Sequence, residues 1–349
     1  MPRSVHLHTT DGWHCFPACW NLRHPCWSWD CKCKYLEPAW DLRDWLLAPQ
    51  DEATQLLSRA WSACAAKPST ALDLAKSRKH GGTPVPLGSL GAVVSGSLSG
   101  KFMEVAGPPG VGKTQFCLHI AALAAANGGE VFWLDSENTF APPRLLEVLE
   151  AVCIARSAGN IHEAEAEALA ALARVRKKSC TSLKELHNIA AELEQRAAQG
   201  VPVPALVIVD SVAAIARNDG DASEPQRVQI PRRQAALSAI AGLFKRIVAS
   251  TNQSLAPPGV VVTNQVAGDP RSGGSRVTLG HVWHHAVNWR LVLSHLPPGD
   301  PRGYGLKESA VGSKRFLHVE KSPCSPPITI EFAICRNGLS EICTIGDVS

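Results

Sequence analysis

The stretch "GPPGVGKTQF", Gly107 to Phe116, decides how the rest of the sequence can be interpreted. It fits the pattern G-x-x-x-x-G-K-[ST] of a phosphate-binding loop, with Gly107, Gly112, Lys113 and Thr114 at the fixed positions. Glycines let backbone N–H groups face the phosphates, Lys113 is expected to reach the β- and γ-phosphates, and Thr114 is expected to hold Mg²⁺. A chance glycine-rich turn is the alternative, but the sequence around the motif favours a site for ATP and Mg²⁺.

Strand and helix patterns alternate on both sides of this loop. Strands are expected at Lys101–Ala106, Glu130–Asp135, Ala205–Asp210 and Gly259–Asn264, and helices at Thr114–Ala126, Pro143–Ala155 and Arg232–Ser250, with two more within Ile161–Gln199. Such a succession predicts an α/β fold with a mostly parallel sheet and helices on both faces. Strands that begin at Trp289, Lys314 and Ile328 have no helices between them, so we expect an antiparallel extension at the sheet edge.

The composition narrows the class of protein. The chain has 349 residues, of which 45% are hydrophobic, enough for one large α/β domain with a small appendage. Its net charge of +4 is too small to indicate nucleic-acid binding by itself. No apolar run reaches the roughly 18 residues of a membrane span, and there is no signal-peptide pattern, so we expect a soluble intracellular protein. Most of the cysteines outside the N-terminal segment are scattered singly, which argues against a disulfide framework.

The N-terminal part of the sequence is expected to divide into three segments that precede the α/β core. Residues 1–34 form a leader rich in Cys and Trp, which we expect to be disordered, residues 35–66 a small helical region, and residues 67–88 a linker to a core at 89–349. The alternative for the leader is a zinc site built from Cys15, Cys19, Cys26, Cys31 or Cys33 with His14 or His24. Paired C-x-x-C spacings are missing there, so zinc is the weaker interpretation.

Polar residues at the ends of the expected strands are candidates for catalysis. Asp210 ends a buried strand and is expected to bind Mg²⁺ with Thr114; a solvated strand-end acid is the alternative. Glu137 follows a strand by two residues, at the edge where open α/β sheets bind ligands, and could orient or deprotonate water. Gln265 could sense the γ-phosphate, although a lone glutamine there is more often a strand cap.

Two segments rich in arginine are candidates for DNA contact. The first follows Asp210 and the second is the loop Val266–Gly280, which we expect to be mobile without a ligand. Arginine suits the phosphate backbone of DNA, whereas solvated charge is the commoner reason for any single one. The candidate DNA residues are Arg217, Arg232, Arg233, Arg271 and Arg276.

In their order, the quoted loop and the segments "WLDSENTFAPPRL", "LVIVDSVAAIAR", "VVVTNQVAG" and "HHAVNWRLVL" resemble the eukaryotic branch of the RecA-like recombinases. The resemblance covers residues 89–349 and is strongest to the DNA-repair paralogues of the B type. It implies a RecA-like ATPase core, Glu137 as catalytic glutamate and Arg144 as the residue that stacks on adenine. The expected nucleotide-binding residues are Gly107, Pro108, Pro109, Gly110, Val111, Gly112, Lys113, Thr114, Gln115 and Arg144.

The resemblance also implies a setting for the protein. It implies a role in homologous recombination and double-strand break repair, DNA and other paralogues as partners in a hetero-oligomer, and residence in the nucleus. In such assemblies the nucleotide lies between subunits, so Lys321 is expected to complete a neighbour's site.

Departures from the family pattern keep alternatives open. No Phe is followed by Ala at the third place, so the peg that joins recombinase subunits is missing, and Asn138 replaces a family glycine. The alternatives are a strand-exchange recombinase that forms filaments on single-stranded DNA, and a scaffold that binds nucleotide without turnover. An unrelated P-loop kinase or transporter ATPase is disfavoured, because the sequence has neither an arginine-rich lid nor a Leu-Ser-Gly-Gly-Gln signature.

Overall fold

A computed structural model describes residues 97–157, 160–219, 225–250, 256–268, 275–296, 314–324 and 326–345. These residues all belong to the compact unit Ala75–Ser349. The predictions for the leader, the small helical region and the linker lie outside the described residues, as does Arg271. The described part of the chain falls within the expected ATPase core.

The core is built on one large sheet whose strands follow the order β10-β9-β8-β7-β1-β5-β4-β2-β3. The strands are β1 Phe102–Gly107, β2 Val131–Asp135, β3 Val175–Ser179, β4 Leu206–Asp210, β5 Gly259–Gly268, β6 Ser275–Val277, β7 Trp289–Ser294, β8 Lys314–Lys321, β9 Thr329–Cys335 and β10 Gly338–Ile345. Strands β7, β1, β5, β4, β2 and β3 pair in parallel, while β8, β9 and β10 continue the sheet in antiparallel pairs. The predicted RecA-like α/β architecture is confirmed.

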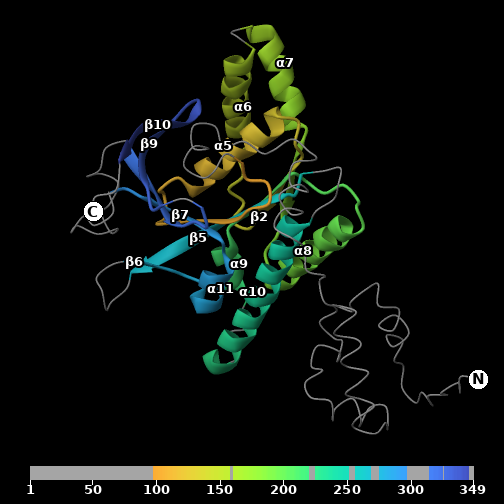
Figure 1. Cartoon of the computed structure of the whole chain (residues 1–349), viewed down its shortest axis with the longest axis vertical. Coiled ribbons are helices and arrows are strands. Elements are labelled where there is room, and N and C mark those ends of the chain that lie inside the picture. The colour runs from red at the N-terminus through yellow and green to blue at the C-terminus, as the bar shows by residue number, and fades with distance from the viewer. Residues whose placement is uncertain are drawn as a thin grey trace, which may run out of the picture. The chain divides into compact units, whose positions relative to one another are not determined.

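Helices cover both faces of the sheet, as Figure 1 shows. The helices are α5 Lys113–Ala126, α6 Pro142–Arg156, α7 Ile161–Leu172, α8 Leu183–Ala198, α9 Val212–Asn218, α10 Gln226–Ala249 and α11 Gly280–Ala286. One core cluster joins α5, α6 and α7 to the sheet, and a second joins α8, α9, α10 and α11 to the opposite face.

Side-chain alternation along the central strands explains this two-sided packing. In β4, Leu206 and Ile208 belong to the first cluster, whereas Val207 and Val209 belong to the second. Successive side chains of a strand point to opposite faces, so a continuous apolar run such as "LVIVD" fits only a strand buried on both faces.

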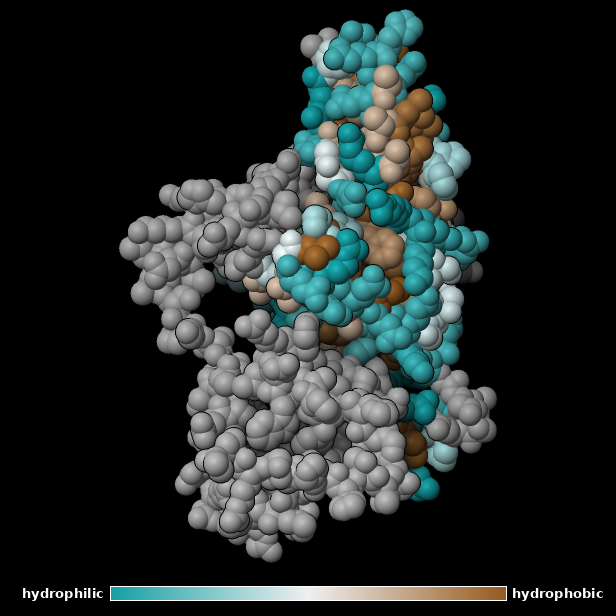
Figure 2. Space-filling view, turned by 90° about the vertical axis from the view of Figure 1, so that its right-hand side faces the viewer, coloured by the Kyte–Doolittle hydropathy of each residue, from teal (hydrophilic) through white to brown (hydrophobic). Residues whose placement is uncertain are grey.

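The helix α7 has a different relation to the core, because it buries mainly small side chains. Ala164, Ala168 and Ala171 face inward at helical spacing, and Ile161 and Leu169 remain exposed. Figure 2 shows apolar surface in the upper part of the molecule, where Figure 1 places α6 and α7. The described residues include no helix with the length and apolarity needed to cross a membrane.

Some sequence expectations about individual elements are wrong. The charged region Ile161–Gln199 contains the two expected helices but also the strand β3. Because β3 is an exposed edge strand, its "VRKKS" sequence needs no apolar alternation and is not recognisable as a strand. The sequence places the strand at Trp289 in the antiparallel extension, yet β7 pairs in parallel with β1 and turns antiparallel only toward β8. Strand β10, which follows β9 through a tight turn, is an addition to the expected strands.

The two arginine-rich segments contain more regular structure than expected. Arg217 lies in α9, and Arg232 and Arg233 lie in α10, which begins at Gln226 rather than at Arg232. The described ends of the second segment pair as β5 and β6, with Val266 opposite Val277, and its last residue starts α11. Short helices and strand ends of this kind depend on tertiary contacts more than on local propensity.

Candidate nucleotide site

The central strands bring the expected site residues to one edge of the sheet. Gly107 pairs with Gln265 across β1 and β5, and Asp135 pairs with Asp210 across β2 and β4. All four strands run in the same direction, so their carboxyl ends lie together. Glu137 follows β2 at the same edge.

The phosphate loop joins β1 to α5 as the motif predicts. A Cβ at Gly107 would approach the Leu293 carbonyl oxygen to 2.6 Å, and Gly112 has a φ of 108° as the N-cap of α5. Both positions therefore require glycine. Because α5 begins at Lys113, its N-terminal N–H groups and the positive end of its dipole are available to an anion held by the loop.

Lys113 lies folded over this loop. Its Nζ donates to the carbonyl oxygens of Gly107 at 2.9 Å and Pro108 at 2.8 Å. Burial lowers the pKa of Lys113, and the negative charges of Asp210 and Glu137 oppose that shift. The ammonium group is thus placed at the loop, where the oxygens of a bound polyphosphate could replace the two carbonyl oxygens as its acceptors.

Thr114 and Asp210 are in direct contact across the loop. The Thr114 hydroxyl donates to Asp210 Oδ2 at 2.7 Å, and the Thr263 hydroxyl donates to Oδ1 at 2.5 Å. Burial raises the pKa of Asp210, while the two hydroxyl hydrogen bonds lower it. A hydroxyl and a buried carboxylate are hard oxygen ligands of the kind Mg²⁺ prefers, so these residues fit that ion.

The segment after β2 is fixed to the end of β4. The Ser136 N–H donates to the Asp210 carbonyl oxygen at 2.9 Å, and the Ser211 N–H donates to Ser136 Oγ at 2.6 Å. Asn138 has a φ of 55°, a left-handed conformation that Asn tolerates better than most residues other than Gly. Asn at position 138 is therefore compatible with the left-handed backbone beside Glu137.

Glu137 and Gln265 are joined by Arg217 of α9. Arg217 NH1 donates to Gln265 Oε1, and its NH2 lies 3.5 Å from Glu137 Oε1. The Ser211 hydroxyl donates to the other oxygen of Glu137 at 3.4 Å. We use the name Arg217 cluster for Glu137, Arg217 and Gln265; it lies at the surface, with the Arg217 and Glu137 side chains 54% and 39% exposed.

A second polar group lies inside the core beneath the same edge. Glu104 of β1 is fully buried and accepts from Asn264 Nδ2 at 2.7 Å, from Trp283 Nε1 at 2.9 Å and from Arg290 Nε at 2.5 Å. We call Glu104, Asn264, Trp283 and Arg290 the Glu104 network. Asn264 Oδ1 also accepts from the Thr278 hydroxyl at 2.6 Å, so the network connects the end of β5 with the segment that leads into α11.

The guanidinium of Arg144, which is expected to stack on adenine, is fixed by hydrogen bonds from its nitrogens. Its Nε donates to Gln115 Oε1 at 2.9 Å, and its terminal nitrogens donate to the carbonyl oxygens of Cys335 and Arg336 at 2.6 and 2.7 Å. All of these bonds use in-plane donors. They fix the orientation of the guanidinium and leave its flat faces as the surfaces suited to stacking.

Lys321 binds within its own subunit. Its Nζ donates to the Val287 carbonyl oxygen at 2.6 Å and to those of His284 and His285 at 3.3 and 3.4 Å. These carbonyls end α11, where a cation is favourable. Burial is the main cause that lowers the pKa of Lys321, with Arg290 and Lys245 as further causes. Its expected role in a neighbour's site stays a prediction.

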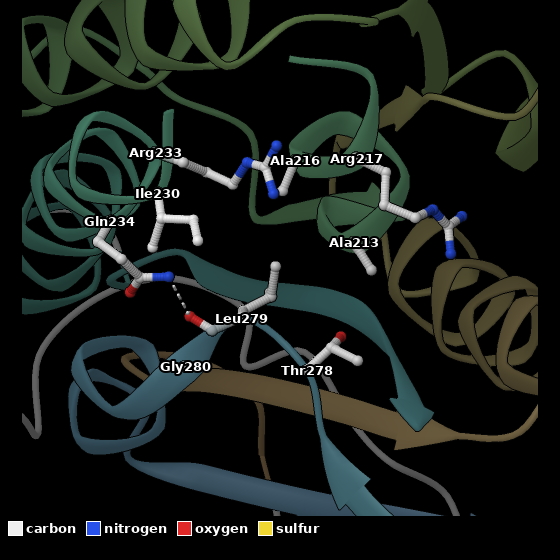
Figure 3. A pocket seen from close by; sticks show the side chains of 9 residues that line it. All are labelled: Ala213, Ala216, Arg217, Ile230, Arg233, Gln234, Thr278, Leu279 and Gly280. Carbon is white, nitrogen blue, oxygen red and sulfur yellow. Dashed lines mark hydrogen bonds between the residues drawn. The ribbon is translucent and has the colours of Figure 1, made fainter. Parts of the chain in front are cut away.

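Two of the candidate DNA residues lie at the same cavity. Arg217 and Arg233 both line a cavity of about 220 Å³ between α9, α10 and the start of α11. Figure 3 shows them on two sides of that cavity. Arg232 lies exposed on α10 without lining it, and Arg276 lies in β6.

Comparison with known proteins agrees with the resemblance seen in the sequence. The family model described as Rad51 matches residues 88–342. The chain belongs to the Rad51 family. Its fold and the order of its motifs along β1, β2, β4 and β5 are those of a Rad51-like recombinase paralogue.

Individual relatives are more distant than the family match. The chain is 27% identical over 316 residues to the Homo sapiens DNA repair protein RAD51 homolog 2, covering 82% of this chain and 76% of that protein. The Mus musculus homolog 2 is 29% identical, covering 82% and 83%. The Mus musculus meiotic recombination protein DMC1/LIM15 homolog is 26% identical over 221 residues, covering 62% of this chain and 55% of the mouse protein.

Some residues of this Rad51-family site carry little signal in the sequence. The Thr263 hydroxyl is the second one that donates to Asp210. The sequence marks Thr263 only as a polar residue within the apolar run "GVVVTN". No sequence pattern marks Ser211 as a site residue, because it is recognisable only as the residue that follows Asp210. The sequence suggests DNA contact alone for Arg217, since nothing in it connects this residue with Glu137 or Gln265.

Proposed function

We propose that this chain is a DNA-repair ATPase of homologous recombination and double-strand break repair. One observation carries the proposal: Lys113, Thr114, Glu137, Asp210 and Gln265 converge at the carboxyl edge of four adjacent strands. Together they supply the parts that phosphoryl transfer to water requires, namely a phosphate cradle, a metal-binding pair, a carboxylate and a polar sensor. The repair and recombination roles in the printed names of its relatives supply the biological setting.

ATP is bound by the loop and the helix behind it. The N–H groups at the start of α5 hold the phosphates, and Lys113 exchanges the carbonyl oxygens of Gly107 and Pro108 for phosphate oxygens. Thr114 and Asp210 would hold Mg²⁺, which supplies charge neutralisation at the phosphates. Arg144 presents a guanidinium face to adenine.

Hydrolysis is assigned to Glu137 and Gln265. Glu137 orients a water molecule and accepts its proton while the water oxygen bonds to the γ-phosphorus and ADP leaves with the electrons of the broken P–O bond. Gln265 contacts the γ-phosphate and, because β5 continues into the segment that pairs with β6, transmits its presence toward the candidate DNA loop.

The expected partners belong to the same proposal. DNA is contacted through Arg217, Arg232, Arg233, Arg271 and Arg276, and the protein acts in the nucleus within a hetero-oligomer of Rad51-family paralogues. Co-purification with tagged paralogues from nuclear extract, with and without ATP, tests the assembly. Recovery of this chain alone under both conditions would contradict it.

ATP turnover by the purified full chain tests the enzymatic part, with and without single-stranded DNA and with the other paralogues added. We compare Lys113→Ala and Glu137→Gln with two exposed control variants, Lys184→Ala and Glu165→Gln. K113A is expected to lose ATP binding, and E137Q is expected to bind ATP but to lose turnover by roughly 100-fold, the usual size of a lost general base. The controls should match the wild type.

The outcomes separate the alternatives kept open by the sequence. ATP binding without turnover under every condition would favour the scaffold over the ATPase. Long filaments of the protein alone on single-stranded DNA, seen by electron microscopy, would favour the strand-exchange recombinase. K113A with unchanged ATP binding would overturn the site itself.

A further inference from the structure

The Arg217 cluster holds its two functional side chains in a form that is not ready for chemistry. Glu137 shares one carboxylate oxygen with Arg217 and the other with the Ser211 hydroxyl. The carbonyl oxygen of Gln265 accepts from the same guanidinium. Both carboxylate oxygens of Glu137 are therefore engaged by the protein itself, although its proposed task is to bind water.

This arrangement is easily reversed because it lies at the surface. Arg217 and Glu137 are both more than one third exposed, and their atoms are 3.5 Å apart. Ion pairs of this kind contribute little to stability, since water and salt compete for both partners. A competing anion for Arg217 can thus release Glu137 and Gln265 together.

The cavity next to Arg217 is suited to such an anion. None of its lining residues is acidic, and two of them are the arginines Arg217 and Arg233. Arg233 Nε is buried and has no hydrogen-bond partner among the described residues. Gln234, by contrast, is already used, because its amide donates to the Leu279 carbonyl oxygen at 3.1 Å, the dashed line in Figure 3.

Figure 3 shows where the two arginines of the cavity point. Arg233 extends from α10 toward Ala216 of α9, whereas the Arg217 guanidinium is directed away from Arg233. The apolar part of the cavity lining is formed by Ala213, Ala216, Ile230 and Leu279. Cationic groups beside an apolar wall match one nucleotide unit of an unpaired strand, with its phosphate on the arginines and its base on the wall.

We propose that Arg217 is a positioning residue that holds Glu137 and Gln265 together until the phosphodiester of a single DNA strand, bound in this cavity with Arg233, draws its guanidinium away. The inference rests on the proposed function and deepens it, because it assigns the regulation of the same site. DNA binding and ATP turnover are then coupled through one side chain. By thermodynamic linkage, Glu137 and Gln265 must weaken DNA binding, because they compete with the phosphodiester for Arg217.

The first test measures ATP turnover of Arg217→Gln with and without oligothymidylate. Without DNA, R217Q should turn over ATP about threefold faster than the wild type, within the range set by a surface ion pair, and DNA should stimulate it no further. The matched control is Arg176→Gln, which breaks another exposed ion pair, to Glu130 at 3.4 Å, outside this cluster. R176Q should keep the wild-type rate and the wild-type stimulation.

Specific results would overturn the inference. R217Q that is as slow as E137Q would make Arg217 a catalytic group, and R217Q that DNA stimulates as strongly as the wild type would remove the coupling. Inorganic phosphate at the same phosphate concentration should give little stimulation; a full effect of phosphate alone would contradict the assignment to a DNA strand.

A second test does not depend on turnover, so it separates failure of this inference from failure of the proposed ATPase. Affinity for fluorescent oligothymidylate is measured for the wild type, E137Q, R217Q and the double variant, without nucleotide. E137Q should bind DNA about threefold more tightly, because it releases Arg217, and the gain should vanish in the R217Q background. Equal affinities of the wild type and E137Q would overturn the proposal even if the chain never hydrolyses ATP.

Discussion

The Glu104 network and the Arg217 cluster both place an arginine against a glutamate near the same sheet edge. The two ion pairs differ in burial and in distance. Arg290 and Glu104 are 1% and 0% exposed and lie 2.5 Å apart, with further donors on the carboxylate. Arg217 and Glu137 are 54% and 39% exposed, 3.5 Å apart. The difference teaches that burial decides whether an ion pair fixes a fold or can be exchanged for a ligand.

The largest expected effect comes from breaking the buried pair. Glu104→Gln leaves the Arg290 charge without its closest carboxylate in the core, and the free energy of unfolding should fall by about 3 kcal/mol. Chemical denaturation measures this. The exposed variant Glu165→Gln should change stability by less than about 0.5 kcal/mol, and a similarly small loss for E104Q would erase the contrast between the two pairs.

His119 provides a half-buried group whose pKa is shifted by burial alone. Its Nδ1 accepts from the Leu339 N–H at 3.4 Å, and burial lowers the pKa of His119 from 6.5 to about 4. As the pH falls from 6.5, the unfolded chain takes up the proton first, so this group removes stability until about pH 4.

The corresponding variant is His119→Asn, which keeps an acceptor and cannot titrate. Between pH 6.5 and 4 the wild type should lose up to about 3 kcal/mol more unfolding free energy than H119N. Denaturant titrations at several pH values measure the difference. Parallel pH profiles for the two proteins would show that the folded chain accommodates a charged imidazole at this position.

Variants of Asn138 test the strain in the backbone next to Glu137, which belongs to the exposed Arg217 cluster. Its φ of 55° strains a residue with an ordinary Cβ, so Asn138→Ala should destabilise the protein by about 1 kcal/mol. Asn138→Gly should stay within about 0.5 kcal/mol of the wild type, because Gly adopts that φ freely. If alanine and glycine were equally tolerated in thermal denaturation, the left-handed turn beside Glu137 would not be under strain.

The smallest effect on stability is expected for Arg217→Gln, whose proposed effect is on turnover. Breaking this exposed pair should change the free energy of unfolding by less than about 0.5 kcal/mol. A loss near that of E104Q would mean that Arg217 holds the fold together. In that case the proposed exchange between Glu137 and DNA would fail.

Much of the fold could be predicted because its signals are local. The loop motif and the apolar runs of β1, β2, β4 and β5 fixed the α/β class and the edge where Gly107, Glu137, Asp210 and Gln265 meet. β3 escaped prediction, since an exposed edge strand needs no apolar alternation. The predicted division of residues 1–88 stays a prediction, as does nuclear residence.

The sequence by itself determined the parts of this Rad51-family core: a phosphate loop, buried parallel strands and the polar residues that end them. Only the tertiary structure decided which of those residues meet. Arg217 reaches Glu137 and Gln265, and Glu104 reaches Arg290, across long stretches of chain. Such pairs depend on strand order and on burial, which no local pattern of residues encodes.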